Sequence, residues 1–472
     1  MLAILAAAAA SPLIVRAAPG YDPWTWLLWG REVASGTLST ADGPAFKPLP
    51  VAVCALLAPL GSAAPVVWVV LVRAAAGAAL VLAYRLARDL DQPRRGQTPS
   101  RVGRGLLAGG LAVVGVALAG GFALEASRGG EAPLVITGAL GAIACWRAGR
   151  LRAALGLAVA CALLRVEAWP FVALAGVAAW RRDPALRAPL AVLAVLVPAA
   201  WFVPEWLGSG DVLRSGSRAR IPNPGQPALA DVPALASLWA VAKLLLVPLW
   251  IGVVLALREP RGTAPSAGGG APAPGGGSRL LAAAGGAWVL LVAAMAQAGF
   301  SGEPRYALPG VALLAVAGAA GLARALAREE TIDRAQPDRS SPRWRLALGA
   351  IAAAAVLSAA PALAELRDVR DAQAHQWALA RDLDAAVRAA GGREEVLACG
   401  RPYVGRYRGP LMAYALDVTK RTVEPDAAPH APGVVFRARL TAASAPAPDA
   451  GPPFRAAARA GEWEVLRSCA EN

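Results

Sequence analysis

Apolar residues occur along the chain in blocks of about 20, separated by short stretches that carry arginine, glycine or proline. A helix of about 20 apolar residues is long enough to cross a bilayer, so each block predicts a membrane span. The segments at 152–164 and 168–180 are short for a core of roughly 30 Å. They could instead form a re-entrant hairpin that turns at Arg165, Glu167 and Pro170. The eleven predicted spans cover about residues 1–15, 63–87, 104–122, 132–147, 152–164, 168–180, 187–206, 233–257, 280–299, 304–327 and 345–363.

The first block, residues 1–15, has no basic residue before its apolar run. A cleaved signal peptide is one interpretation of such a segment. The string of later spans favours a first transmembrane helix, shortened if the start codon has been misplaced.

Three regions lie outside the predicted spans. Residues 17–62 form a long first external loop, and 258–279 form a linker rich in glycine and proline, predicted to be cytoplasmic. In the region after residue 363, the pattern from 365 to 390 is that of an amphipathic helix ended by glycine. The short apolar pieces EVLAC, GVVF and EWEVLRSC then indicate strands. The sequence therefore predicts an α-helical polytopic membrane domain (1–363) and a small α+β C-terminal domain (364–472).

Composition agrees with this pattern. Of the 472 residues 56% are hydrophobic and 17% charged, and the mean hydropathy is +0.47, which argues against an ordinary soluble domain. The net charge of +15 could suggest nucleic acid. The arginines gather in loops between spans, however, where membrane topology places them. No nucleic-acid partner is expected.

Counting basic residues in alternate loops predicts the orientation, because cytoplasmic loops carry the excess. Nineteen fall in one set of loops and eight in the other. The N-terminus is then cytoplasmic and the C-terminal domain extracytoplasmic, in a multi-pass protein of the cell membrane. The smaller, external set is Arg31, Lys47, Arg128, Arg165, Arg214, Arg218, Arg220 and Arg305.

Two of the five cysteines, Cys399 and Cys469, lie in the C-terminal domain. An extracytoplasmic compartment is oxidising, so these two could form a disulfide. The five cysteines show no CxxC spacing and the chain has only two histidines, which makes a zinc site improbable.

The first external loop is the richest in candidate chemistry. Asp22 follows the first span and is surrounded by Trp24, Trp26 and Trp29, with Glu32, Asp42 and Lys47 behind it. A carboxylate beside apolar surface can serve as a general base for a hydroxyl group. The alternative is an interfacial loop anchored by tryptophans, with ordinary solvated acids.

Three stretches, YDPWTWLLWGREVASG, LLRVEAWPF and QAGFSGEPRYALPG, resemble integral-membrane glycosyltransferases of the GT-C class, in particular actinobacterial ones. The resemblance covers about residues 1–363. It implies transfer of a sugar from a polyprenyl-phosphate donor to a glycan, glycolipid or protein acceptor on the outer face of the membrane.

In that class an acidic residue of the first external loop acts as base or helps to hold a divalent metal, and Asp22 is the matching position. Many members have two adjacent acids there, whereas this chain has Asp22-Pro23. A second carboxylate for a metal cannot be assigned, so a divalent metal stays an open possibility and no other cofactor is expected.

Charged residues at the predicted outer membrane edge complete the candidate site. Arg305 and Arg165 could bind the donor phosphate, because a guanidinium group can hold two phosphate oxygens at once. Lys47, Glu32 and Glu131 are further candidate substrate contacts, and Glu125 lies near Glu131. The alternative is that Arg165 pairs with Glu167, and Arg305 with Glu303, only to neutralise charge near the membrane.

Two other functions remain open from the sequence. A transporter or lipid-linked sugar flippase would use buried charges to line a path, and inverted repeats would favour it, but no convincing repeat is present. A structural or assembly protein would use its C-terminal domain as a binding module.

Overall fold

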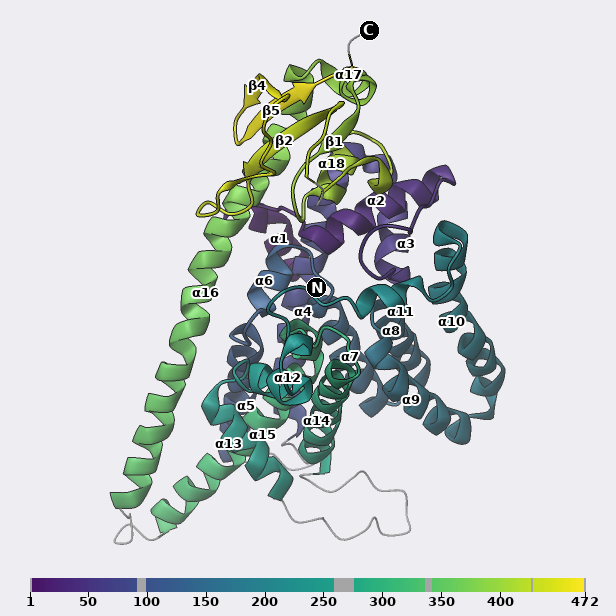
Figure 1. Cartoon of the computed structure of the whole chain (residues 1–472). Coiled ribbons are helices and arrows are strands. Elements are labelled where there is room, and N and C mark those ends of the chain that lie inside the picture. Colours follow the sequence, from purple (N-terminus) through teal and green to yellow (C-terminus); the bar gives the residue numbers. More distant parts are fainter. Residues whose placement is uncertain (1, 91–98, 259–275, 336–341, 426–427, 471–472) are drawn as a thin grey trace.

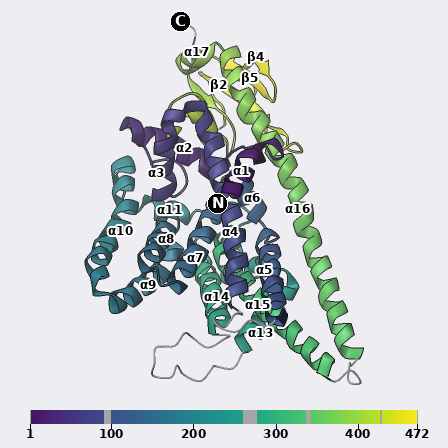
Figure 2. The same cartoon turned by 180° about the vertical axis from the view of Figure 1, so that it is seen from behind.

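The computed structural model describes residues 2–90, 99–258, 276–335, 342–425 and 428–470. Helices make up nearly all of the molecule, and a small unit with strands lies at one end (Figure 1). A long helix, α16 (Pro342–Ala389), runs along one side of the bundle and leads into that unit, as the opposite view also shows (Figure 2). The predicted linker lies mostly outside the described residues, since α13 ends at Arg258 and α14 begins at Gly276.

Within the described residues, five helices are long and apolar enough to cross a membrane. A sixth span is possible if α12 (Pro233–Ala242) and α13 (Val247–Arg258), which are bent by 105° at their junction, count as one. Four shorter apolar helices are also present, so the chain is a multi-pass membrane protein, although eleven full spans are not established. The five long segments are Pro48–Leu90, Pro184–Ser209, Gly276–Gln297, Pro304–Arg328 and Gly349–Ala389.

Helix α15 (Leu308–Ala335) is at the centre of the bundle, packed against α4 (Ala64–Leu90), α5 (Pro99–Ala117), α13 and α14 (Gly276–Gln297). Small residues allow its backbone to approach its neighbours closely. A Cβ atom added to Gly318 would lie 2.4 Å from the carbonyl oxygen of Leu249. Alanine there would force α13 and α15 apart.

The segment 17–62, predicted as an external loop, is largely helical. It contains α2 (Tyr21–Ser35), α3 (Pro48–Leu57) and most of a 3₁₀ turn at Ala58–Ala63. Trp26 and Trp29 are fully buried. The alternative of an interfacial loop anchored by tryptophans is therefore wrong for Trp26, because α2 packs between the bundle and the C-terminal unit instead of lying against lipid.

Helix α1 (Leu2–Ala10) precedes this segment and packs against α4. It ends in a 3₁₀ turn at Ser11–Leu13. Arg73 of α4 donates hydrogen bonds to the Ser11 hydroxyl and to the carbonyl of Val15, at 2.9 and 2.8 Å. This intramembrane cation is thereby satisfied by the chain itself.

Helices α8 (Leu151–Leu164) and α9 (Trp169–Arg182) meet at a break where the hairpin was predicted to turn. Arg165 has an extended backbone, with φ −149° and ψ 133°, and a 3₁₀ turn, Val166–Ala168, follows. Pro170 sits in the first turn of α9, where a missing N–H is tolerated. The other helices of this part of the chain are α6 (Phe122–Ser127), α7 (Ala132–Arg147), α10 (Arg187–Ser209) and α11 (Arg214–Ala219).

Helix α16 continues unbroken through residue 363, where the sequence suggested a boundary between two domains. Its apolar span makes little contact with the bundle, and Val356 and Leu357 are more than 70% exposed in the protein alone. Farther along, Leu379 and Leu383 are fully buried in the core of the C-terminal unit. One rigid element thus joins the membrane part to that unit.

The C-terminal unit has a sheet in the order β1-β2-β5-β4, in which β1 (Arg401–Tyr403) and β2 (Gly433–Arg439) are parallel. β4 (Arg455–Ala460) and β5 (Trp463–Ser468) complete it in antiparallel pairing, and the short β3 (Pro446–Ala447) pairs with β2. EVLAC, predicted as a strand, belongs to helix α17 (Gly392–Cys399). A short apolar run fits either a strand or a helix that is buried on one face.

The core of this unit combines residues from helix and sheet, and Leu28 of α2 belongs to it. Helix α18 (Gly409–Ala415) packs on α2, and Arg31 donates to the carbonyl of Tyr414 at 3.0 Å. A disulfide joins Cys399 to Cys469. These contacts fix the unit directly over α2, the helix that carries Asp22.

Candidate active site

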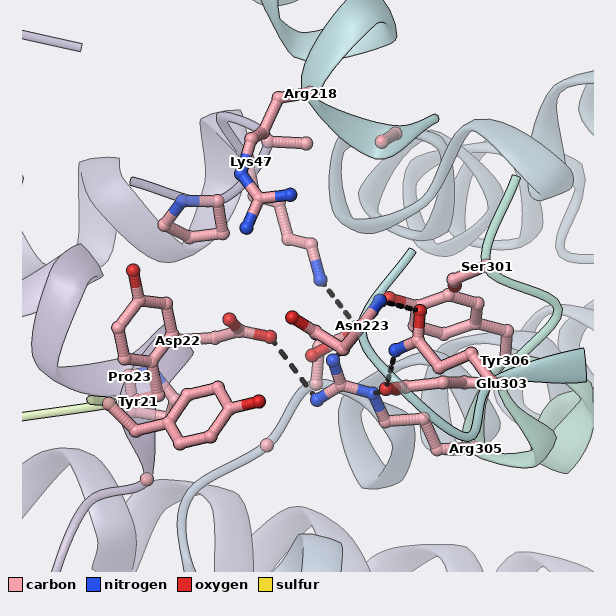
Figure 3. Close-up of a pocket in the computed structure, with 18 of the residues that line it drawn as sticks. Tyr21, Asp22, Pro23, Lys47, Arg218, Asn223, Ser301, Glu303, Arg305 and Tyr306 are labelled. Carbon is pink, nitrogen blue, oxygen red and sulfur yellow. Dashed lines mark hydrogen bonds and ion pairs between the residues drawn. The ribbon is translucent and has the colours of Figure 1, made fainter. Parts of the chain in front are cut away.

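A cavity of about 1080 Å³ lies where the bundle, α2 and the C-terminal unit meet. Its wall includes Asp22, and five of the eight basic residues predicted to be external also line it: Lys47, Arg128, Arg165, Arg218 and Arg305. Residues more than 280 positions apart thus share one site. Figure 3 shows Asp22 reaching from the α2 side toward Arg305, with Glu303 and Tyr306 beside that arginine.

Proline residues help to place several of these charges. Lys47 and Glu303 each immediately precede a proline that begins a helix. A residue before proline is restricted to extended backbone, and Lys47 has φ −134° and ψ 111°. The proline itself suits the first turn of a helix. The backbone conformation of Lys47 and of Glu303 is therefore restricted at the start of a helix, which helps to direct each side chain into the cavity.

Asp22 and Arg305 form the central ion pair. Asp22 Oδ2 lies 3.2 Å from Arg305 Nη1, and the two side chains are 13% and 23% exposed. Arg305 also pairs with Glu303 and lies 3.9 Å from the carboxylate of Glu125. Three carboxylates thus surround one guanidinium group that remains in contact with solvent.

Arg165 is the centre of a second, more deeply buried network. Its Nη1 is 2.7 Å from Glu131 Oε1, and its Nε and Nη2 both bind the carboxylate of Glu167. Its guanidinium lies 3.9 Å from the centre of the Tyr306 ring. Arg165 thus pairs with Glu167, as one alternative from the sequence had it, and it also lines the cavity; its contact with a substrate stays a prediction.

Lys47 connects this network to α2. Its ammonium group binds Glu131 and lies 5.2 Å from the centre of the Trp26 ring. Glu131 is buried at the N-terminus of α7, yet among the described residues its Oε2 has no hydrogen-bond partner, and neither does Glu125 Oε2. Such orphaned buried oxygens are costly.

Hydrogen bonds join the loop at residues 41–46, next to Lys47, to helix α11, which carries Arg218. Arg214 of α11 donates to the carbonyls of Ala41, Gly43 and Pro44, and also contacts the carboxylate of the fully buried Glu205. Glu205 also accepts a hydrogen bond from Ser215, whose hydroxyl receives the N–H of Phe46 at 2.8 Å. No sequence pattern pointed to this contact, because its partners are about 170 residues apart.

Glu32, a predicted substrate contact, lies elsewhere. It is 4% exposed, accepts a hydrogen bond from the Ser39 N–H at 3.0 Å and does not line the cavity. Burial raises its pKa to about 7, although the Ser39 hydrogen bond and Arg31 oppose the shift. Its Oε1 finds no partner within the part of the chain that the structure describes, in keeping with a carboxyl group that prefers its neutral form. Glu32 therefore lies outside the cavity lining, and its ionisation costs stability.

The substitution Glu32→Gln is expected to stabilise the protein above neutral pH. Between about pH 4.5 and 7 the unfolded chain loses its proton while the folded chain keeps it, so wild-type stability falls as pH rises. The gain from glutamine should grow over that range to at most about 3 kcal/mol. Unfolding in detergent at pH 4.5 and pH 8 measures it. An equal effect at both pH values would contradict the assignment.

The donor set does not fit a divalent metal. No group of three or more His, Cys, Asp or Glu that could hold an ion occurs in the described residues. The carboxylates around Asp22 are each paired with an arginine or a lysine, so their charge is already compensated by the chain itself. The chemistry of this site is accordingly derived from its charged side chains.

Sequence reasoning found many of the residues that meet here and missed others. Asp22, Lys47, Glu131, Arg165 and Arg305 come together, as do Glu125, Glu167 and Glu303. Tyr306, which lies under both arginines, was missed, although its position next to Arg305 was a signal. Residues from the C-terminal unit were also missed as cavity lining: Arg406, Arg408, Leu411, Pro425 and Leu440.

Comparison with solved structures identifies the architecture. ArnT from Cupriavidus metallidurans, bound to undecaprenyl phosphate, matches with a TM-score of 0.52 at 15% sequence identity. The match covers 98% of this chain and 96% of that one. The chain shares the fold of ArnT. The ArnT structure in the apo state matches with a TM-score of 0.46 at 14% identity.

The likeness to ArnT extends over both the membrane helices and the C-terminal unit, since nearly all of each chain is covered. It confirms the predicted fold class, a GT-C-like polytopic helical protein with a small α+β unit at its C-terminus. No family model and no curated protein sequence matches the chain.

Proposed function

We propose that this protein is a membrane glycosyltransferase that moves a sugar from a polyprenyl-phosphate donor to a cell-envelope acceptor on the outer face of the membrane. The observation that carries the proposal is the pairing of Asp22 with Arg305 in a large cavity at the junction of membrane helices and C-terminal unit. The ArnT likeness supports it, because that protein binds undecaprenyl phosphate. Fold alone does not define activity, so the site must supply the argument.

The cations of the cavity suit a phosphate group. Arg305, Arg165, Lys47 and Arg218 line one space, and arginine in particular binds phosphate oxygens through two parallel hydrogen bonds. The cavity also has an apolar part, lined by Trp169, Trp201, Phe202 and Met295. A polyprenyl chain that carries a phosphate head needs both surfaces.

The carboxylates supply the base. In the transfer step the acceptor oxygen attacks the anomeric carbon, the bond from that carbon to the phosphate oxygen breaks, and the acceptor proton passes to Asp22. The departing phosphate keeps the electron pair of the broken bond, and its charge is stabilised by Arg305, Arg165 and Lys47. Protonated Asp22 later returns its proton to solvent.

In the structure Asp22 is held by Arg305, and an ion-paired carboxylate is a poor base. A donor phosphate that binds Arg305 competes directly with Asp22 for the same guanidinium. We therefore expect donor binding to release Asp22 toward the acceptor. Asp22 would then be free to act as a base only when the donor is bound. We expect this to limit hydrolysis of the donor by water.

A direct test is transfer by membranes that contain the protein, using radiolabelled polyprenyl-phosphate sugars and envelope extracts as acceptor. Formation of a labelled glycosidic product that depends on expression of the chain is the expected result. A flippase would move the labelled lipid across the bilayer and leave its sugar-phosphate bond intact. That outcome would replace the proposal with the transporter alternative.

Replacement of Arg305 tests the cation. Arg305→Gln removes the charge from the hydrogen bonding to the phosphate, and the net loss of one charged hydrogen bond, about 1.5–3 kcal/mol, should lower polyprenyl-phosphate affinity roughly 10- to 150-fold. The affinity of Arg305→Lys should lie between those of the wild type and Arg305→Gln, since lysine keeps the charge but lacks the planar guanidinium group. Titration of the purified protein with polyprenyl phosphate measures this. Exposed Arg328 of α15 is the control position; equal affinity of Arg305→Gln and Arg328→Gln would refute the role.

A further inference from the structure

The C-terminal unit contributes a loop to the cavity wall. Arg406, Tyr407 and Arg408, between β1 and α18, line the same cavity as Asp22. Tyr407 is 40% exposed, whereas Tyr403 and Trp463, aromatic residues of the same unit, are fully buried in its packing. Tyr407 therefore presents an aromatic surface to the site instead of to a core.

The backbone at Tyr407 is strained in a way that places this ring. Its φ is +65°, a left-handed conformation that is rare for a bulky residue and energetically unfavourable. Such strain persists only where the surroundings enforce it, and it tends to occur at functional sites.

The neighbouring Arg408 provides that enforcement. It is 2% exposed and donates to the carbonyls of Ala438 and Ala447, at 2.8 and 3.0 Å. Burial lowers its pKa to about 10, so it stays charged near neutral pH. Gly405 has φ +74°, and a Cβ atom there would lie 2.7 Å from Arg408 Nη2. The loop is thus fixed on both sides of Tyr407.

Tyr407 lies next to the proposed base. Its ring meets that of Tyr21 edge to face, with centroids 6.0 Å apart, and Tyr21 precedes Asp22 in the first turn of α2. Gln373 and Gln376 of α16 also line the cavity. Gln376 donates to the carbonyl of Leu440, which keeps α16 against the C-terminal unit.

This wall carries Arg406, whose guanidinium lies 5.1 Å from the centre of the Tyr407 ring, and Arg408, and beside them it offers aromatic rings and side-chain amides. Tyrosine rings offer flat apolar faces with a polar edge, and amides offer neutral hydrogen-bonding groups. A sugar ring has the complementary character, with C–H faces and hydroxyl groups around its edge. We propose that Tyr407, backed by Tyr21, is the subsite for the acceptor, and that the acceptor group bound there is a carbohydrate ring. This rests on the proposed function.

The test uses the full chain in lipid nanodiscs, with hexyl glycosides as acceptor probes and hexanol as the probe that lacks a sugar. Loss of one aromatic contact worth about 0.5–1.5 kcal/mol should raise the glycoside KM of Tyr407→Ala roughly 2- to 12-fold. The donor KM and the KM for hexanol should not change. Tyr407→Phe, which keeps the ring, should retain most of the affinity.

Direct titration of the nanodiscs with hexyl glycosides, without donor, separates this inference from the function. Weaker glycoside binding by Tyr407→Ala than by the wild type supports the subsite even if no sugar transfer occurs. In that case the transferase function is contradicted and the subsite is not. The subsite would be overturned if wild type and Tyr407→Ala had equal glycoside affinity or equal glycoside KM. A rise in the donor KM of Tyr407→Ala that matches the rise in its glycoside KM would also overturn it. Absence of measurable glycoside binding by the wild type in both assays would overturn it as well.

Discussion

Replacement of Asp22 by asparagine is expected to lower sugar transfer by about 100- to 10,000-fold, the contribution typical of a general base. Asparagine has nearly the same shape and keeps an oxygen that can accept from Arg305, 3.2 Å away, but it cannot take up a proton. The fall should appear in kcat, while affinity for polyprenyl phosphate is retained. Initial rates with labelled donor at equal protein levels measure it.

Asp42→Asn is the matched control. Asp42 belongs to the same segment, is exposed, and approaches Arg421 only at 3.7 Å, so its loss should leave transfer unchanged. Asp22→Asn with full activity would show that another group takes the proton. Glu125 and Glu303, which share Arg305 with Asp22, would then be the next carboxylates to replace.

Arg165→Gln is expected to lower the free energy of unfolding by about 3–5 kcal/mol, because removing one partner of a buried ion pair leaves the other uncompensated. Arg165 is 7% exposed, and the carboxylates it pairs with are 2% and 4% exposed. Glu131 keeps Lys47, but Glu167 loses the cation that binds it. Denaturation of the purified protein in mixed micelles measures the loss.

A second substitution separates charge from packing. Adding Glu167→Gln to Arg165→Gln removes the orphaned charge, so the double variant should recover part of the lost stability. Arg152→Gln changes an exposed arginine of α8 and should shift stability by no more than about 0.5 kcal/mol. If the double variant is less stable than the single one by the full cost of Glu167→Gln alone, the pair does not interact energetically.

The position of Glu32 illustrates how sequence reasoning about the site reached its limit. Asp22 and Glu32 lie in one acidic, aromatic segment and were both candidates. That segment is a helix, and ten residues advance it by about 15 Å, so only one end of α2 reaches the cavity. Hydropathy gave no sign of the helix, because α2 is buried between two parts of the protein and its apolar residues look like membrane anchors.

The C-terminal unit shows a second limit. Its presence and mixed α+β character followed from the pattern after residue 363, but EVLAC became a helix, and the unit took α16 and part of α2 into its core. Whether a short apolar run pairs as a strand depends on neighbours distant in sequence. Among its aromatic residues, Tyr403 and Trp463 are buried in the packing of the unit, whereas Tyr407 lines the cavity.

The GT-C-like fold class was implied by a resemblance to a known family. By itself the sequence determined the membrane character of the chain and a set of charged residues that are expensive to place near lipid. These are local properties, since the cost of burying a side chain depends on its type and immediate neighbours. Tertiary structure alone decided which charges meet: Asp22 with Arg305, and Lys47 with Glu131. It also decided that the loop at residues 406–408 lines the same cavity as these pairs. Such pairings arise from helix packing between distant segments, to which local hydropathy is blind.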